Sequence, residues 1–176
     1  MLRKSTQIAI GGVCAALSLV FMLFSIILPF STYALPALSG AALIPIAVEM
    51  GLSVGGVCYL AVAILSLILV PDPETSLMFI CFLGYYPILK FKLDRIRSKP
   101  LKIILKHLLF NAAILLSYQL LIYLFHLSDL IDSFGGSTWV LGFLLAGNLV
   151  FILYDAALRN LIFFYCHIFR KRYLRK

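Results

Sequence analysis

Charged residues are scarce in this chain. Only 12% of its 176 residues are Asp, Glu, Lys or Arg, whereas 63% are hydrophobic. A soluble domain of this size needs a charged shell, which so few charged side chains cannot form. Apolar runs of about 20 residues are instead what a helix needs to cross the hydrocarbon core of a bilayer. We therefore expect residues 1–176 to form one all-α integral membrane domain, and we expect no nucleic-acid partner despite a net charge of +8.

Signatures of catalysis and metal binding are also missing from the sequence. It contains no H-E-x-x-H, no G-x-S-x-G and no P-loop glycine pattern. The cysteines form no C-x-x-C pair and lie in or at the end of apolar runs, at Cys14, Cys58, Cys81 and Cys166. We therefore predict no enzymatic activity, no metal and no cofactor. Without a P-loop, active transport would need an ion gradient or a partner ATPase.

Six apolar runs, separated by polar or Pro- and Gly-containing breaks, predict six transmembrane helices. They are expected at about residues 6–28, 34–48, 52–70, 76–89, 101–127 and 139–164. The first run follows Arg3 and Lys4, as in a signal peptide. It is longer than the roughly 7–15 apolar residues of such a peptide, so we expect it to be retained as a helix. The second segment either crosses the membrane or forms a re-entrant hairpin with the third.

The basic residues predict the orientation of these helices. All but Arg159 of the 15 Lys and Arg residues lie in three clusters: before the first helix, at residues 90–106, and at residues 170–176. Six crossings place all three clusters on one side, which the positive-inside rule identifies as the cytoplasm. The opposite loops carry acidic residues, including Asp72 and Glu74. We expect both termini to be cytoplasmic, in a multi-pass protein of a bacterial-type plasma membrane. A four-crossing arrangement with a hairpin fits the charges equally well.

Polar and aromatic residues gather toward the predicted outer side. Tyr and Trp at helix ends form interfacial belts, whereas amides within membrane helices either bridge helices or bind a ligand. An outward-opening pocket made by the first, third and fifth loops would bring these groups together. The candidate substrate-binding residues are Tyr33, Tyr118, Gln119, Tyr123, Trp139 and Asn148.

Two further patterns are candidates for function. Asp155 and Arg159 are four residues apart on the last helix, which predicts an internal ion pair or, less simply, a proton or ion relay. On the first helix, Gly11, Gly12, Ala15 and Ala16 form overlapping small-xxx-small pairs. Small residues on one face let another helix approach closely, within this bundle or from a separate membrane subunit.

The opening sequence Ile8-Ala9-Ile10-Gly11-Gly12-Val13-Cys14-Ala15-Ala16-Leu17 resembles the start of substrate-binding S components of energy-coupling factor transporters. Pro29, the segment Leu35-Pro36-Ala37-Leu38-Ser39-Gly40 and the Gly51–Gly56 region extend this similarity over about the first 70 residues. The resemblance implies a small bundle of six helices that captures a vitamin or its precursor from outside. It also implies that the small residues of the first helix dock against a transmembrane coupling subunit, while paired cytoplasmic ATPases supply energy. The first loop, Phe30–Tyr33, is shorter than the gating loop of some members.

Two other functions remain open. A structural or scaffolding protein of the cell envelope would explain the lack of catalytic residues. A self-contained secondary carrier could use Asp155 as a proton site, but such carriers usually have inverted repeats or broken helices around a midplane site. The sequence shows neither feature.

Overall fold

The computed structural model describes residues 4–28, 32–125 and 137–167, which are almost entirely helical and contain no strand. The first three predicted helices are found close to their expected positions. They correspond to α1 (Lys4–Leu23) with the 3₁₀ turn η1 (Phe24–Ile26), to α2 (Ala34–Ala42) followed by α3 (Ile44–Glu49), and to α4 (Leu52–Leu69). The second predicted helix is broken because Pro45 has no N–H for the carbonyl of Ala41, and Leu43 instead closes a 3₁₀ turn onto Gly40.

The fourth predicted helix has three parts. They are α5 (Pro73–Met78), one π-helical turn η3 (Phe79–Leu83), and α6 (Tyr86–Leu93), which extends four residues past the predicted end. Asp72 caps α5, because its carboxylate accepts a hydrogen bond from the Glu74 N–H at 3.2 Å. The last two helices are α7 (Lys99–Phe125) and α9 (Ser137–Phe164).

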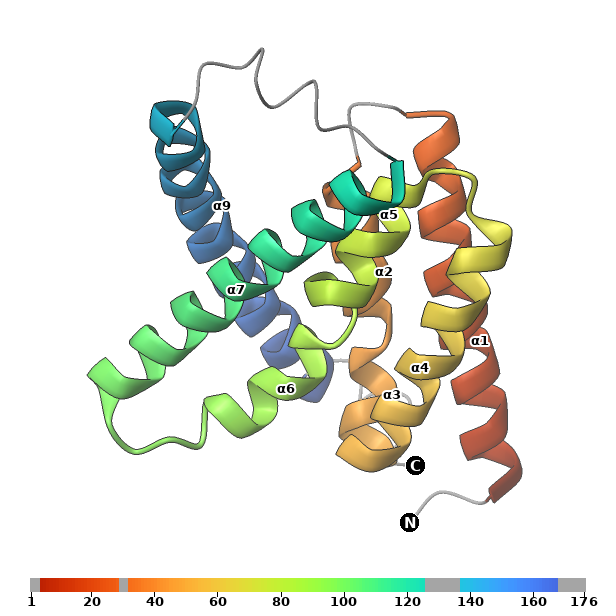
Figure 1. The fold of residues 1–176 in the computed structure, drawn as a ribbon. Coiled ribbons are helices and arrows are strands. Elements are labelled where there is room, and N and C mark those ends of the chain that lie inside the picture. Colours follow the sequence, from red (N-terminus) through yellow and green to blue (C-terminus); the bar gives the residue numbers. More distant parts are fainter. Residues whose placement is uncertain (1–3, 29–31, 126–136, 168–176) are drawn as a thin grey trace.

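Successive segments run in alternating directions. Figure 1 shows α1, α4 and α7 running from one end of the molecule toward the other, and α2–α3, α5–α6 and α9 running back. The turn between α3 and α4 is made by Gly51, whose φ of 94° lies in the left-handed region that L side chains rarely adopt. The starts of α2 and α5 and the final turns of α7 therefore lie at the same end of the bundle.

Five of the helical segments are long and apolar enough to cross a membrane: Ser5–Ile26, Leu52–Leu69, Pro73–Leu93, Lys99–Leu124 and Leu144–His167. The sixth, Ala34–Glu49, is shorter. Large apolar side chains on these segments point outward; Ile68 is 75% exposed and Leu145 is 73% exposed. Such continuous apolar exposure is rare on water-soluble proteins and fits a lipid surrounding.

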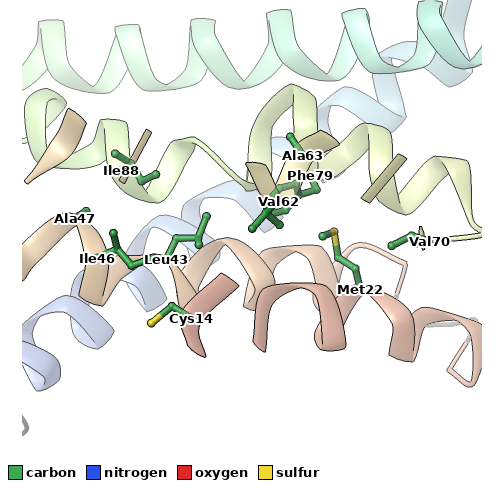
Figure 2. Packing of buried hydrophobic residues seen from close by; sticks show 10 residues of the cluster. All are labelled: Cys14, Met22, Leu43, Ile46, Ala47, Val62, Ala63, Val70, Phe79 and Ile88. Carbon is green, nitrogen blue, oxygen red and sulfur yellow. The ribbon is translucent and has the colours of Figure 1, made fainter. Parts of the chain in front are cut away.

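The interior is divided between two clusters of buried side chains. The first joins α1, α3 and α4 to η3 and α6, with Val62 and Ala63 packed near Phe79 (Figure 2). The second joins α3, η3, α6, α7 and α9 around stacked aromatic rings; the Phe110 and Phe151 rings have centroids 4.8 Å apart. Through this second cluster α9 is attached to the bundle.

One close backbone contact joins α2 to η3. A Cβ atom added to Gly40 would lie 1.9 Å from the carbonyl oxygen of Leu83. No other residue fits there unless α2 and η3 separate, because the opposing atom belongs to the backbone. Gly40 thus lets the first half of the chain approach the π-helical turn from which α6 continues.

Candidate functional site

A hydrogen-bonded polar cluster lies at the end of the bundle where α2 and α5 begin. The Tyr33 hydroxyl donates to Glu74 Oε1 at 2.6 Å, and its oxygen lies 2.8 Å from the Tyr118 hydroxyl. Because a tyrosine has one O–H to donate, Tyr118 is the donor to Tyr33. Burial, followed by these contacts with Glu74 and Tyr118, raises the pKa of Tyr33 above its ordinary value. We call Tyr33, Glu74 and Tyr118 the outer cluster.

The other candidate substrate-binding residues are not part of this cluster. Gln119 is exposed, and Tyr123 is 80% exposed on the surface of α7. Trp139 belongs to α9, but its side chain lies outside the described residues. Asn148 lies on α9 and bonds to another helix. The structure therefore brings together Tyr33 and Tyr118 from the predicted set, and Tyr33 also binds Glu74, which was not in that set.

Asn148 bridges α9 to α7 through Asn111. The Asn148 side chain donates to Asn111 Oδ1 at 2.9 Å, and Asn111 donates back to Asn148 Oδ1 at 3.3 Å. Each amide also donates to the carbonyl one turn earlier on its own helix, Leu144 for Asn148 and His107 for Asn111. An amide within a membrane helix was expected either to bridge helices or to bind a ligand; Asn148 bridges two helices.

The small residues of α1 do not share one face. A Cβ on Gly11 would lie 3.9 Å from Met50 and from Cys58, and Ala15 packs against the first buried cluster. Gly12 has nothing within 4 Å of such an atom, and Ala16 is exposed. Gly11 and Ala15 therefore pack inside the molecule, whereas Gly12 and Ala16 are open to a neighbour.

An apolar groove lies beside this face of α1. Its volume is about 630 Å³, and α1, α2, α3 and the end of α9 form its walls. Its lining includes Ala9, Val13, Leu17, Ala41, Pro45 and Leu161. These small and medium-sized side chains leave a channel along α1 that an acyl chain or another helix can fill.

The predicted ion pair between Asp155 and Arg159 is wrong. Asp155 Oδ1 accepts hydrogen bonds from Lys90 and from Tyr86, the latter at 2.5 Å, and both Asp155 oxygens lie 3.0 Å from Lys106 Nζ. Arg159 is exposed and, within the part of the chain that the structure describes, forms no ion pair. Lys90 on α6 and Lys106 on α7 point into the interior and contact Asp155. The four-residue spacing on α9 therefore does not pair Asp155 with Arg159, whose side chain is exposed.

Asp94, which follows α6, completes this arrangement. Its carboxylate oxygens lie 3.4 Å from Lys90 Nζ and 2.8 Å from Lys106 Nζ. Each ammonium group therefore touches both carboxylates, in a four-membered charge ring that joins α6, α7 and α9. Lys90 is 1% exposed and Lys106 is 6% exposed, so opposite charges must lie beside them. We call Lys90, Asp94, Lys106 and Asp155 the charge ring.

The charge ring was not predicted from the sequence, where Lys90 and Lys106 belong to one of the basic clusters expected on the cytoplasmic side. One signal was available: Lys90 stands four residues before Asp94, and Lys106 four residues after Lys102, a spacing that keeps charges on one helix face. The partner across helices, Asp155, has no such local signal.

The two sites differ in the chemistry they offer. The outer cluster combines hydroxyl groups with a carboxylate and can exchange hydrogen bonds with a polar solute. The charge ring presents ammonium groups at the opposite end of α7. No protein-family model matches this chain, and neither does any curated protein or solved structure.

Proposed function

We propose that the chain is the substrate-capture subunit of a membrane importer for a small molecule such as a vitamin or its precursor. The observation that carries this proposal is the outer cluster: Tyr33, Glu74 and Tyr118 come from three segments and meet at one end of a largely apolar bundle. Tyr33 is 44% exposed, so a solute can reach the hydroxyl and carboxylate groups of this cluster from outside the bundle. In the importer, a polar solute would exchange hydrogen bonds with these three side chains.

The proposed orientation places the outer cluster outside the cell. It assumes six crossings with both termini cytoplasmic, an arrangement that places the basic segments inside and the acidic loops outside. The alternating helix directions in Figure 1 support it, because they put the start of α1 and the end of α6 at the end opposite to Tyr33. The short α2–α3 pair would complete the sixth crossing.

Two features support the proposed partners: the sequence has no P-loop, and α1 has an uncovered face at Gly12 and Ala16. The missing P-loop leaves an ion gradient or a partner ATPase as the energy source; the proposed source is separate ATPase subunits that act through a transmembrane coupling subunit. Gly12 and Ala16 offer a face on which a helix of that coupling subunit can pack closely. This is the arrangement that the resemblance to S components of energy-coupling factor transporters implies.

Ligand capture is tested by purifying the full chain from its native membrane in mild detergent and identifying retained small molecules by mass spectrometry. Wild-type protein should retain a polar solute, and Tyr33→Phe and Glu74→Gln should each lose most of it. Tyr123→Phe is the matched control, because Tyr123 is 80% exposed and outside the outer cluster. Retention that is equal in all four proteins would remove the outer cluster as the binding site.

The same purification tests the partners. Gly12→Leu and Ala16→Leu should abolish co-purification of ATPase and coupling subunits without unfolding the chain. Gly56→Leu on α4 is the matched control, since a Cβ at Gly56 also meets nothing within 4 Å. If the wild-type chain brings down neither a solute nor an ATPase, the importer role is wrong and a scaffolding role becomes the better explanation.

A further inference from the structure

Three lysine side chains from two helices converge on one carboxylate at the end of α6. Asp94 lies 2.8 Å from Lys106 Nζ, 3.4 Å from Lys90 Nζ and 4.0 Å from Lys102 Nζ. Asp94 itself is 40% exposed, whereas Lys90 is almost completely buried. We call the ammonium groups of Lys90, Lys102 and Lys106 the cradle. Lys90 is its buried part, and the Asp94 carboxylate occupies its solvent-exposed side.

The cradle carries more positive than negative charge. Three ammonium groups face the two carboxylates of Asp94 and Asp155, which leaves one positive charge uncompensated. Lys102 is the source of this excess. Its only ion pair among the described residues is the 4.0 Å contact with Asp94, and it makes no hydrogen bond there. Its three N–H donors are available to another acceptor.

Exposed apolar residues and exposed basic residues both neighbour the cradle along the chain. Next to Lys102 on α7, Leu101, Ile103 and Ile104 are 54%, 56% and 63% exposed. Directly after Asp94, the turn that follows α6 carries exposed Arg95 and Arg97. A ligand that meets both surfaces needs an anionic group next to hydrocarbon. Basic pockets between membrane helices recognise anionic lipid headgroups in this way.

We propose that Lys90, Lys102 and Lys106 form a binding site for the phosphate of an anionic phospholipid. The phosphate takes the place of the Asp94 carboxylate, which turns outward into solvent, and the acyl chains lie along the exposed apolar face of α7. Asp155 stays in place between Lys90 and Lys106 and keeps the two ammonium groups apart and directed toward the ligand. The site does not depend on solute import and would exist equally in a scaffolding protein.

Native mass spectrometry of the purified full chain in detergent tests this site, with phosphatidylglycerol and phosphatidylcholine added separately. Wild-type protein should retain phosphatidylglycerol in clear preference to phosphatidylcholine. Lys102→Gln should weaken phosphatidylglycerol binding about fivefold, the factor expected for one interfacial cation. Lys92→Gln is the matched control: it removes one exposed basic charge, but residues two apart from Lys90 and Asp94 do not share their helix face.

The variant Asp94→Asn distinguishes a lipid-binding site from an ion network that only stabilises the fold. If the carboxylate competes with the phosphate, this substitution strengthens phosphatidylglycerol binding several-fold. Weaker binding in Asp94→Asn, or equal losses in Lys102→Gln and Lys92→Gln, would overturn the proposal. A third arm adds inorganic phosphate as a competitor. If inorganic phosphate on the order of 1 mM displaces the lipid, the site binds a soluble anion and the lipid proposal is wrong.

Discussion

Asn111 and Asn148 face each other across α7 and α9 and exchange hydrogen bonds, with Asn148 donating at 2.9 Å and Asn111 at 3.3 Å. In a double-mutant cycle with Asn111→Ala and Asn148→Ala, we expect a coupling energy of about 0.5–2 kcal/mol, as for other interhelical polar pairs in membranes. The measurement is reversible unfolding in mixed micelles. Gln119→Ala, an exposed amide on α7, should show no coupling with Asn148→Ala.

Replacement of Asp155 should be among the most destabilising substitutions in α9. Asp155→Asn keeps the shape but leaves Lys90 and Lys106 with Asp94 as their one carboxylate in the ring, so we expect a loss of about 3 kcal/mol in the free energy of unfolding. Arg159→Gln, on an exposed side chain of the same helix, should change stability by less than about 0.5 kcal/mol.

A second substitution checks the reason for this loss. If an uncompensated lysine is the cause, Lys106→Met should recover part of the stability lost in Asp155→Asn, because Lys90 and Asp94 then form a neutral pair. A double variant that is less stable than either single variant would contradict the role assigned to the charge ring.

Gly40 and Gly12 should respond in opposite ways to the same substitution. Gly40→Ala brings a methyl group against the Leu83 carbonyl oxygen and forces α2 away from η3, at a cost of about 3 kcal/mol. Gly12→Ala meets nothing within 4 Å and should leave stability unchanged or raise it by up to about 1 kcal/mol, because alanine favours the helix. The measurement is thermal unfolding of both variants in the same detergent. If Gly40→Ala were as stable as Gly12→Ala, α2 and η3 would not pack this closely.

The crossing by α2–α3 can be tested by cysteine labelling in a background with the four native cysteines replaced. Pro71→Cys should react with an impermeant maleimide added outside, and Ser98→Cys only after the inner face is opened. Ser53→Cys, just after the Gly51 turn, decides between the two topologies. Six crossings make it reactive from the cytoplasm, whereas a re-entrant hairpin buries it in the membrane; all three positions are exposed in the structure.

Helix positions followed closely from the sequence because hydropathy and breaks are local signals. Pro29, the Glu49–Gly51 turn and the Pro71–Glu74 segment separate apolar runs, and the observed helix ends lie within a few residues of those predicted. The interruption at Leu43 and the π-helical turn at Phe79–Leu83 were not predicted. The interruption at Leu43 has a local signal in Pro45, which was read as part of a continuous helix. The π-helical turn lies where η3 packs against α2 near Gly40, and no local pattern in the sequence records that contact.

The candidate site was only partly predictable for the same reason. Tyr33 and Tyr118 were expected near an outer pocket from their positions on the predicted topology, and they do meet. Lys90 and Lys106 were counted as cytoplasmic charges, because the positive-inside pattern reports the side of the membrane and not the direction of a side chain. Their burial is decided by Asp155, which lies 49 residues beyond Lys106.

The charge ring also makes the packing of α6 and α7 dependent on α9. α6 and α7 are synthesised with Lys90 and Lys106 facing Asp94 alone, so the ring is one negative charge short until α9 arrives. Buried lysines that lack part of their compensating charge are destabilising, so we expect the ends of α6 and α7 to pack less firmly in that state. Asp155 supplies the missing carboxylate. A chain truncated before α9 should therefore be less stable than the loss of helix-packing contacts alone would make it, because two buried lysines then share one carboxylate.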